Sequence, residues 1–279
     1  VVYKDKQLTY AEVDEMSDRI AKYVSDRLKV KDAVSEPVVS VLIPRSEWMP
    51  IASLGVLKAG CAYQPLDPTY PKERLNFMMQ DADAKLLIAD EELRGIVDEY
   101  HGDVLLTRNI DTLPVVATPV QANITPSSLF IMLYTSGSTG VPKGCQLEHG
   151  NIVCFCHWYQ RFYELTAESR VAAYASYGFD ACMMDMYPAL TCGACVHIIP
   201  EEIRLDLIAL NDYFEREHVT HAFMTTQVGY QFATSIENHS LRYLSTGGEK
   251  LAPMTPPASY RFYNVYGPTE CTVLTTSYL

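Results

Sequence analysis

The run Leu-Tyr-Thr-Ser-Gly-Ser-Thr-Gly-Val-Pro-Lys-Gly at positions 133–144 constrains this chain more than any other segment. It follows an apolar stretch, 129–133, that is typical of a buried strand, and a helical pattern begins about four residues after it. A strand that leads into a glycine loop rich in hydroxyls is a sound cradle for a polyphosphate, although a plain Ser/Gly surface turn is the alternative. The groups available to a phosphate are the hydroxyls, the glycine backbone and one cation, from Thr135, Ser136, Gly137, Ser138, Thr139, Gly140, Lys143 and Gly144.

This loop differs from the common P-loop of nucleotide triphosphatases. A P-loop has a Gly-Lys pair followed by a Ser or Thr whose hydroxyl holds magnesium. Here Lys143 is preceded by Pro142 and followed by Gly144, so that hydroxyl is missing. A metal ligand must therefore come from another part of the chain.

Composition limits the classes of protein that remain. The formal net charge of −12 argues against nucleic-acid binding through general electrostatics, so an anionic nucleotide must be held by a local site. No apolar run of about 18 residues exists, which predicts no membrane span. Of the eight cysteines, the two close pairs, Cys154/Cys156 and Cys192/Cys195, stand in apolar settings that suit free thiols, and with no signal peptide the expected compartment is the cytoplasm. Because the first residue is Val1 and not Met, the start is interpreted as a cut.

Apolar strand-like runs alternate with helical segments through most of the chain, which predicts a parallel-rich α/β fold. A stretch at 111–128 contains three prolines and several Thr, Ser and Ala residues, which is typical of a connection. It predicts a division into subdomains 1–125 and 126–279. Ligands of such sheets bind at the carboxyl ends of strands, where the loop, 245–249 and 266–270 are expected to lie. The predicted strands are 38–43, 61–66, 85–89, 104–106, 129–134, 171–175, 195–199, 221–224, 241–246 and 262–266, and the predicted helices are 10–28, 47–58, 71–80, 91–100, 151–163, 205–217 and 228–233.

Five segments in one order carry a family resemblance. They are Leu-Thr-Tyr-Ala-Glu-Val (8–13), Leu-Lys-Ala-Gly-Cys-Ala-Tyr-Gln-Pro-Leu-Asp-Pro (57–68), the loop at 133–144, Phe-Asp-Ala (179–181) and Asn-Val-Tyr-Gly-Pro-Thr-Glu (264–270). This series resembles the amino-acid adenylation domains of nonribosomal peptide synthetases, which are adenylate-forming enzymes. The resemblance spans almost the whole chain. It implies the N-terminal core of that fold, with two parallel-rich sheets and helices on both faces in an αβαβα layering.

The resemblance also implies an activity and its partners. Such enzymes join the carboxylate of an amino acid to ATP with Mg²⁺, release pyrophosphate, and pass the aminoacyl group to a thiol. That thiol belongs to phosphopantetheine on a carrier protein, and a condensation domain belongs to the same assembly. The physical task is to bring two anions together for in-line attack.

Residue roles follow from the same resemblance. Lys143 would contact the triphosphate, Thr269 would donate to the α-phosphate and Glu270 would hold Mg²⁺, a single carboxylate that this ion accepts alongside phosphate oxygens. Tyr266 would stack on adenine, and Asn264 would read its polar edge. The full nucleotide-binding set is Thr135, Ser136, Gly137, Ser138, Thr139, Gly140, Lys143, Gly247, Gly248, Glu249, Asn264, Tyr266, Gly267 and Thr269.

In this resemblance Asp180 pairs with the α-ammonium group of the substrate, a charge-assisted contact that selects amino acids over simple fatty acids. From the residues alone, an Asp after Phe179 is more often a helix N-cap, and the two roles are compatible. Except for Asp180 the predicted pocket is uncharged, which indicates a neutral, apolar amino acid, leucine-like first and aromatic second. Its members are Asp180, Ala181, Met184, Phe223, Ser245, Gly247, Val265, Val273 and Leu274.

The chain stops at Leu279, before the C-terminal subdomain that brings a catalytic lysine in this family. Poor adenylation by this chain alone is therefore expected. Two other classes of function stay open at this point. One is another adenylate-forming ligase, such as a D-alanine–carrier-protein ligase or an acyl-CoA synthetase, and the other is an inactive docking module.

Overall fold

The computed structural model describes residues 1–29, 36–136 and 141–279. The chain forms two compact units. The first, here called the N-terminal unit, is Leu8–Ile152, and the second, the C-terminal unit, combines Val1–Gln7 with Val153–Leu279. The subdomain boundary expected between residues 125 and 126 stays a prediction.

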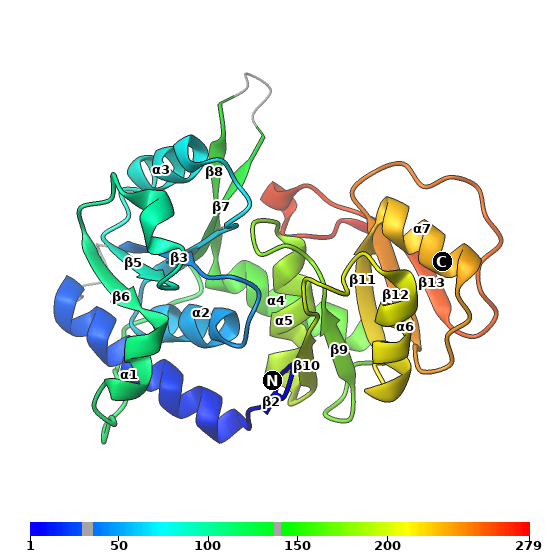
Figure 1. Ribbon diagram of the computed structural model, residues 1–279, viewed down its shortest axis with the longest axis horizontal. Helices are drawn as coiled ribbons and strands as arrows, with labels where there is room; N and C mark the ends of the chain where they lie inside the picture. The colour runs from blue at the N-terminus through cyan, green and yellow to red at the C-terminus, as the bar shows by residue number, and fades with distance from the viewer. Residues whose placement is uncertain (30–35, 137–140) are drawn as a thin grey trace. The chain divides into compact units, whose positions relative to one another are not determined.

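The N-terminal unit is built on a six-stranded sheet in the order β6-β5-β3-β4-β7-β8. All neighbouring strands are parallel except the last pair, which is antiparallel. Figure 1 shows β7 and β8 as a long hairpin. The strands are β3 (Val38–Leu42), β4 (Ala62–Leu66), β5 (Leu86–Ala89), β6 (Asp103–Leu106), β7 (Leu129–Thr135) and β8 (Lys143–Glu148), and the helices are α1 (Tyr10–Leu28), α2 (Trp48–Lys58), α3 (Lys72–Asp81), η1 (Arg94–Val97) and η2 (Thr107–Thr112).

The C-terminal unit has an eight-stranded sheet in the order β14-β13-β12-β11-β9-β10-β1-β2. Its six central strands are parallel, and β14 and β2 close the two edges in antiparallel pairing. The strands are β1 (Val2–Tyr3), β2 (Lys6–Gln7), β9 (Arg170–Ala173), β10 (Cys195–Ile198), β11 (His221–Thr225), β12 (Tyr243–Gly247), β13 (Arg261–Tyr266) and β14 (Thr276–Tyr278), and the helices are α5 (Ala181–Cys192), α6 (Leu207–Arg216), α7 (Thr226–Ser235) and η3 (Thr269–Cys271). Helix α4 (His149–Phe162) carries the chain from one unit into the other.

Alternation along the strands of the C-terminal unit sorts side chains onto two faces. Met224, Leu244 and Phe262 pack with residues of α6 and α7 in one apolar core, and Figure 1 shows these two helices beside the sheet. The neighbouring positions, Phe223 and Ser245, point to the opposite face because successive side chains alternate. That second face carries the predicted substrate pocket.

Local signals explain where several helices begin. At α1, the Thr9 hydroxyl accepts from the N–H of Glu12, and the Glu12 carboxylate accepts from the N–H of Thr9, a capping box. At α6, the carboxylate of Asp206 accepts from the N–H groups of Ile208 and Ala209. These caps satisfy amide donors that a helix start leaves unpaired.

The expected α/β architecture with two largely parallel sheets is confirmed. The expected helix at 91–100 is wrong, because only the 3₁₀ turn η1 forms there. Asp90 accepts from the N–H of Glu92, and the Arg94 guanidinium donates to the carbonyls of Val97 and Tyr100, so side chains satisfy backbone groups that a longer helix would have paired.

Helix α5 is missing from the expected helices, although the N-cap interpretation of Asp180 points to a helix start there. Its residues from Ala181 to Ala189 are all buried, so the segment lacks the polar stripe that marks a helix in sequence, and Pro188 interrupts the pattern further. The predicted phosphate loop leads first into strand β8, and helix α4 starts only at His149. Among the described residues, none of the helices is both long and apolar enough to cross a bilayer, and the eight cysteines are free thiols.

Candidate functional site

Four strands of the C-terminal unit end at the same edge of its sheet. They are β9, β11, β12 and β13, which run parallel, so their carboxyl ends lie together. The predicted residues Asp180, Gly248, Gly267 and Thr269 stand in the segments that follow β9, β12 and β13. Parallel pairing therefore gathers at one edge residues that are far apart in the sequence.

Asp180 and Thr269 touch at this edge. The Thr269 hydroxyl donates to Asp180 Oδ2 at 2.8 Å. Asp180 occupies the N-cap position of α5, yet its side chain makes no capping hydrogen bond, so the N-cap reading holds for position only. Burial raises the pKa of the Asp180 carboxyl, the bond from Thr269 opposes that rise, and the negative charge of Glu270 adds to it. Two carboxylates that repel each other make this a place that favours cations.

The chain leading into α5 is positioned by a residue that the sequence did not single out. Asp185 is 2% exposed, and its Oδ2 accepts from the N–H groups of both Tyr174 and Ala175 at 2.8 Å. A buried carboxylate is stable when it accepts such hydrogen bonds. Asp185 thereby fixes the start of the loop between β9 and Asp180.

The end of β12 and the loop after it explain why glycine stands at 247 and 248. A Cβ on Gly247 would lie 2.5 Å from the carbonyl oxygen of Val265, and Gly248 has φ of +108°, which favours glycine. The Thr226 hydroxyl accepts from the N–H of Glu249 at 3.0 Å and donates to its carbonyl at 3.1 Å. The backbone predicted to read adenine is thus held from a residue at the start of α7 that no motif marked.

The predicted adenine platform lies at the end of β13. Tyr266 is 66% exposed, as a ring that stacks on a ligand requires, and Asn264 is partly buried on the same strand. Gly267 follows, where a Cβ would lie 2.3 Å from the carbonyl oxygen of Val273. The short turn η3 then carries Thr269 and the exposed Glu270.

Most side chains predicted to line the substrate pocket are buried. Phe223 on β11, Ser245 on β12 and Val265 on β13 share one face of the sheet, and Met184 comes from α5. Val273 has φ of +70°, an uncommon conformation for a β-branched residue and a form of strain that gathers at functional sites. Leu274 is partly exposed and Gly247 is buried. The buried side chains are Ala181, Met184, Phe223, Ser245, Val265 and Val273.

The predicted phosphate loop belongs to the N-terminal unit, where it joins β7 to β8. Thr135 pairs with Lys143 across the hairpin, and Ser136, Lys143 and Gly144 are exposed. Below them, the Tyr134 hydroxyl donates to Asp81 at 2.7 Å and anchors β7 to α3. Four predicted contacts lie outside the described residues: Gly137, Ser138, Thr139 and Gly140.

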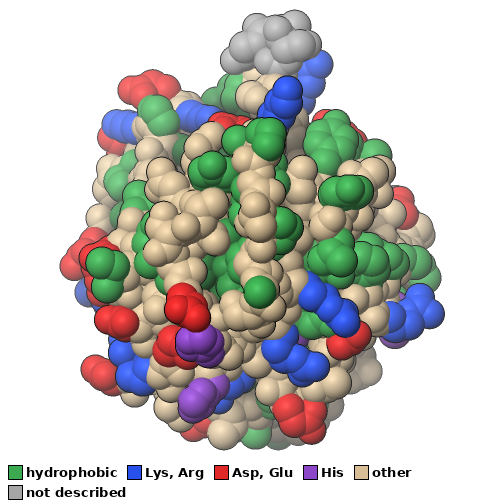
Figure 2. Space-filling model, turned by 90° about the vertical axis from the view of Figure 1, so that its right-hand side faces the viewer, with side chains coloured by type: hydrophobic (Ala, Val, Ile, Leu, Met, Phe, Trp, Pro, Cys, Tyr) green, Lys and Arg blue, Asp and Glu red, His purple; other side chains and the backbone are tan. Residues whose placement is uncertain are grey.

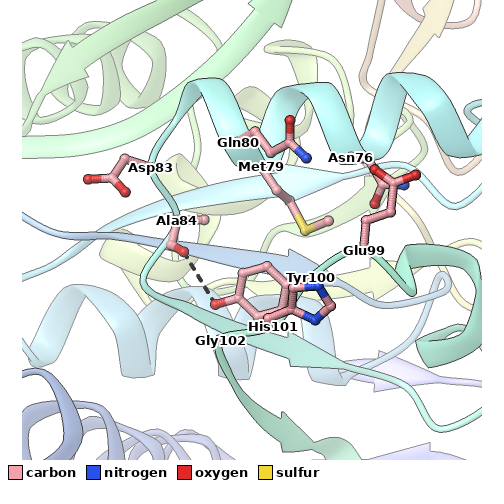
Figure 3. A pocket seen from close by; sticks show the side chains of 9 residues that line it. All are labelled: Asn76, Met79, Gln80, Asp83, Ala84, Glu99, Tyr100, His101 and Gly102. Carbon is pink, nitrogen blue, oxygen red and sulfur yellow. Dashed lines mark hydrogen bonds between the residues drawn. The ribbon is translucent and has the colours of Figure 1, made fainter.

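A pocket of about 310 Å³ lies elsewhere in the N-terminal unit, between α3 and the segment that leads into β6 (Figure 3). The Tyr100 hydroxyl donates to the Ala84 carbonyl at 3.3 Å inside it. None of the predicted site residues lines this pocket, so it is separate from the chemistry described above. Its lining residues are Asn76, Met79, Gln80, Asp83, Ala84, Glu99, Tyr100, His101 and Gly102.

Comparison with known proteins gives the family. Surfactin synthase subunit 2 of Bacillus subtilis (strain 168) is 43% identical over 284 residues, covering 99% of this chain and 8% of that protein. Among solved structures, a four-domain nonribosomal peptide synthetase bound to AMP and glycine matches with a TM-score of 0.80 and 27% identity, covering 97% of this chain and 20% of that one. The N-terminal subdomain of Klebsiella oxytoca NpsA, in complex with 3-hydroxybenzoyl-AMSN, has the same fold, with a TM-score of 0.85 at 23% identity over 98% of this chain and 69% of that one.

The chain thus spans about a twelfth of the length of Surfactin synthase subunit 2. A family model described as "AMP-binding enzyme" matches residues 1–279, which is the whole length of this chain. The chain belongs to the AMP-binding enzyme family.

Proposed function

We propose that this chain activates an amino acid as its aminoacyl-AMP, using ATP and Mg²⁺, as part of nonribosomal peptide synthesis. The observation that supports this most directly is the pairing of Asp180 with Thr269, next to the charge of Glu270. A carboxylate for an ammonium group and a hydroxyl for a phosphate then stand within one hydrogen bond of each other. Simple acyl substrates have no ammonium group and would leave the Asp180 carboxylate without a cationic partner.

The residues present fit a magnesium ion. Glu270 is exposed at the sheet edge, and its charge adds to that of Asp180, so a cation there would be stabilised. Magnesium is commonly bound by one or two carboxylates together with phosphate oxygens and water. When bound, it would neutralise charge on the phosphates. The exposed Lys143 on β8 would supply a second positive charge to the triphosphate.

We infer an apolar amino acid as substrate, leucine-like first and aromatic second. The predicted pocket side chains Met184, Phe223 and Val265 are all buried, and a charged substrate side chain among them would lose its hydration without gaining a partner. Burying a leucine-sized side chain contributes roughly 1.5–3 kcal/mol. The apolar lining therefore favours binding of an aliphatic substrate and disfavours binding of Asp, Glu, Lys and Arg.

The proposed partners are the amino acid, a carrier protein whose phosphopantetheine thiol receives the aminoacyl group, and a condensation domain, all in the cytoplasm. Similar segments occur within Surfactin synthase subunit 2 and Bacitracin synthase 1, of which this chain covers 8% and 5%. Nucleic acid is not a proposed partner. The face drawn in Figure 2 shows acidic and basic side chains intermixed, and the net charge is −12.

ATP–pyrophosphate exchange measured with each of the twenty amino acids, at protein concentrations high enough to detect slow exchange, tests the proposal. Exchange should depend on Leu or another apolar amino acid, and it should be lost in Glu270→Gln and Lys143→Ala but kept in Lys22→Ala, which removes an exposed lysine paired with Asp26. Calorimetric binding of an aminoacyl sulfamoyl-adenosine, a stable analogue of the adenylate, gives an independent readout. A preference for a charged amino acid would refute the proposed substrate, and no binding of any such analogue would refute the proposed reaction.

A further inference from the structure

We propose that Tyr163 determines substrate specificity by holding the hydroxyl of Ser245, the one uncharged polar side chain in the predicted pocket. This inference rests on the proposed function, in which the residues around Ser245 receive the side chain of an amino acid. Tyr163 belongs to none of the sequence motifs. Its role follows from contacts that only the folded chain makes.

The phenol of Tyr163 bridges two strands of the C-terminal unit. Tyr163 follows the last residue of α4 and is 0% exposed. Its Oη lies 3.1 Å from the Oγ of Ser245 on β12 and 3.1 Å from the Oγ of Ser277 on β14. Strand β13 lies between these two strands, and Ser277 is the register partner of the pocket residue Val265. Tyr163 therefore covers the pocket face of the sheet.

The surroundings hold this phenol in place. Its ring packs edge-on against Tyr243 and Tyr263, with centroids 5.8 and 5.4 Å away. The imidazole Nε2 of His221 lies 2.8 Å from the Tyr163 carbonyl oxygen, which can only accept, so Nε2 donates. Burial raises the pKa of Tyr163, so the phenol keeps its proton at neutral pH.

The proton of the Ser245 hydroxyl can be assigned. Ser245 donates its proton to Tyr163 Oη, and the phenol proton is then available to Ser277. The Ser245 hydroxyl therefore has no proton left for a substrate. A substrate side chain that needs a hydrogen-bond donor at this place would stay unsatisfied in a desolvated site, so an apolar side chain is favoured.

Replacing Tyr163 by Phe keeps the ring and frees the Ser245 proton. A substrate carrying an acceptor oxygen then gains a donor, whereas its apolar isostere gains nothing. Valine and threonine form such an isosteric pair. We expect Tyr163→Phe to lower the ratio of the threonyl to the valyl dissociation constant by about three- to tenfold, the range of one neutral hydrogen bond.

The test is calorimetric titration of the chain with valyl and threonyl sulfamoyl-adenosine. Tyr260→Phe is the matched control, since it removes a buried phenol oxygen that has no hydrogen-bond partner among the described residues. The ratio should shift in Tyr163→Phe and stay unchanged in Tyr260→Phe. Equal changes in both constants in Tyr163→Phe would assign Tyr163 a purely structural role and overturn the inference.

Ser245→Ala provides a second test that does not depend on the folding of Tyr163→Phe. With Tyr163 intact, it should change the ratio by less than about twofold, because the Ser245 proton that is removed is already donated to the phenol oxygen. In the Ser245→Ala background, Tyr163→Phe should no longer shift the ratio. A tenfold change in Ser245→Ala alone would overturn the inference. If neither analogue nor any other aminoacyl one binds the unsubstituted chain, the proposed function fails and this inference with it.

Discussion

The Thr269 hydroxyl donates a 2.8 Å hydrogen bond to the carboxylate of Asp180, although the two residues lie 89 positions apart in the sequence. The bond joins the proposed ammonium site to the proposed phosphate site. A hydroxyl has one proton, so Thr269 cannot donate to Asp180 and to a phosphate oxygen at the same time. The two proposed ligands are therefore coupled through one side chain.

We expect the amino acid to strengthen AMP binding, because an ammonium group on Asp180 releases the Thr269 proton for the phosphate. The coupling should be about three- to tenfold in the unsubstituted chain, kept in Thr269→Ser and lost in Thr269→Val. Calorimetric titration with AMP, with and without saturating leucine, measures it. Equal coupling in Thr269→Val and Thr269→Ser would show that the hydroxyl has no part in it.

Asp180→Asn should weaken binding of the aminoacyl analogue by roughly 10- to 150-fold, the range of a charge-assisted hydrogen bond. The same change should stabilise the unliganded chain. Burial raises the pKa of Asp180 in the folded state, so folding disfavours the ionised form, and the gain from Asn should appear at neutral pH and vanish in acid, where Asp180 is protonated. Thermal unfolding at several pH values checks this, with the exposed Asp212→Asn as control. A gain that persists in acid would contradict it.

Two buried histidines predict a loss of stability in acid. Burial lowers the pKa of His197 to about 3 and that of His221 to about 4. Folded-state values below the ordinary value mean that the unfolded chain binds more protons, so this contribution is full above about pH 6.5 and falls as pH decreases. Because the unfolded chain then binds two more protons than the folded chain, the free energy of unfolding should fall by about 2.7 kcal/mol for each unit of decrease in pH between roughly pH 5.5 and 4.5. Any effect of the carboxylates adds to this change.

Urea unfolding at a series of pH values measures this slope. His221→Gln should reduce the slope by about half, whereas His157→Gln, at an exposed position, should leave it unchanged. An unchanged slope in a variant lacking both His197 and His221 would show that other groups cause the acid sensitivity.

Gly247→Ala should destabilise the chain by about 1–3 kcal/mol, the usual cost of overpacking a closely packed site. Its Cβ would lie 2.5 Å from the Val265 carbonyl oxygen, a backbone atom that can move only if β13 moves. Gly95→Ala is the control, because a Cβ there meets nothing within 4 Å. The free energy of unfolding in urea should be lower for Gly247→Ala than for Gly95→Ala. Equal values would show that β13 moves without loss of stability.

Much of the local structure could be predicted from the sequence. The capping box at Thr9 and the long apolar period of 10–28 mark α1, and continuous apolar runs mark the central strands. The sequence pattern does not predict helix α5, because a helix that is buried on every side has no periodic polar stripe. The sequence does not predict strand β8 either, because its glycine, lysine and glutamate residues are weak strand formers. They adopt a strand because the segment pairs with β7.

The order of motifs by itself determined the family and named the residues for each expected role, because motif spacing is a property of the chain. Which of those residues touch was decided only by tertiary structure. The Asp180–Thr269 bond and the Tyr163 bridge from Ser245 to Ser277 join residues 82 to 114 positions apart. Such contacts depend on the register of parallel strands and on how α4 and α5 meet the sheet, and no local preference in the sequence encodes either.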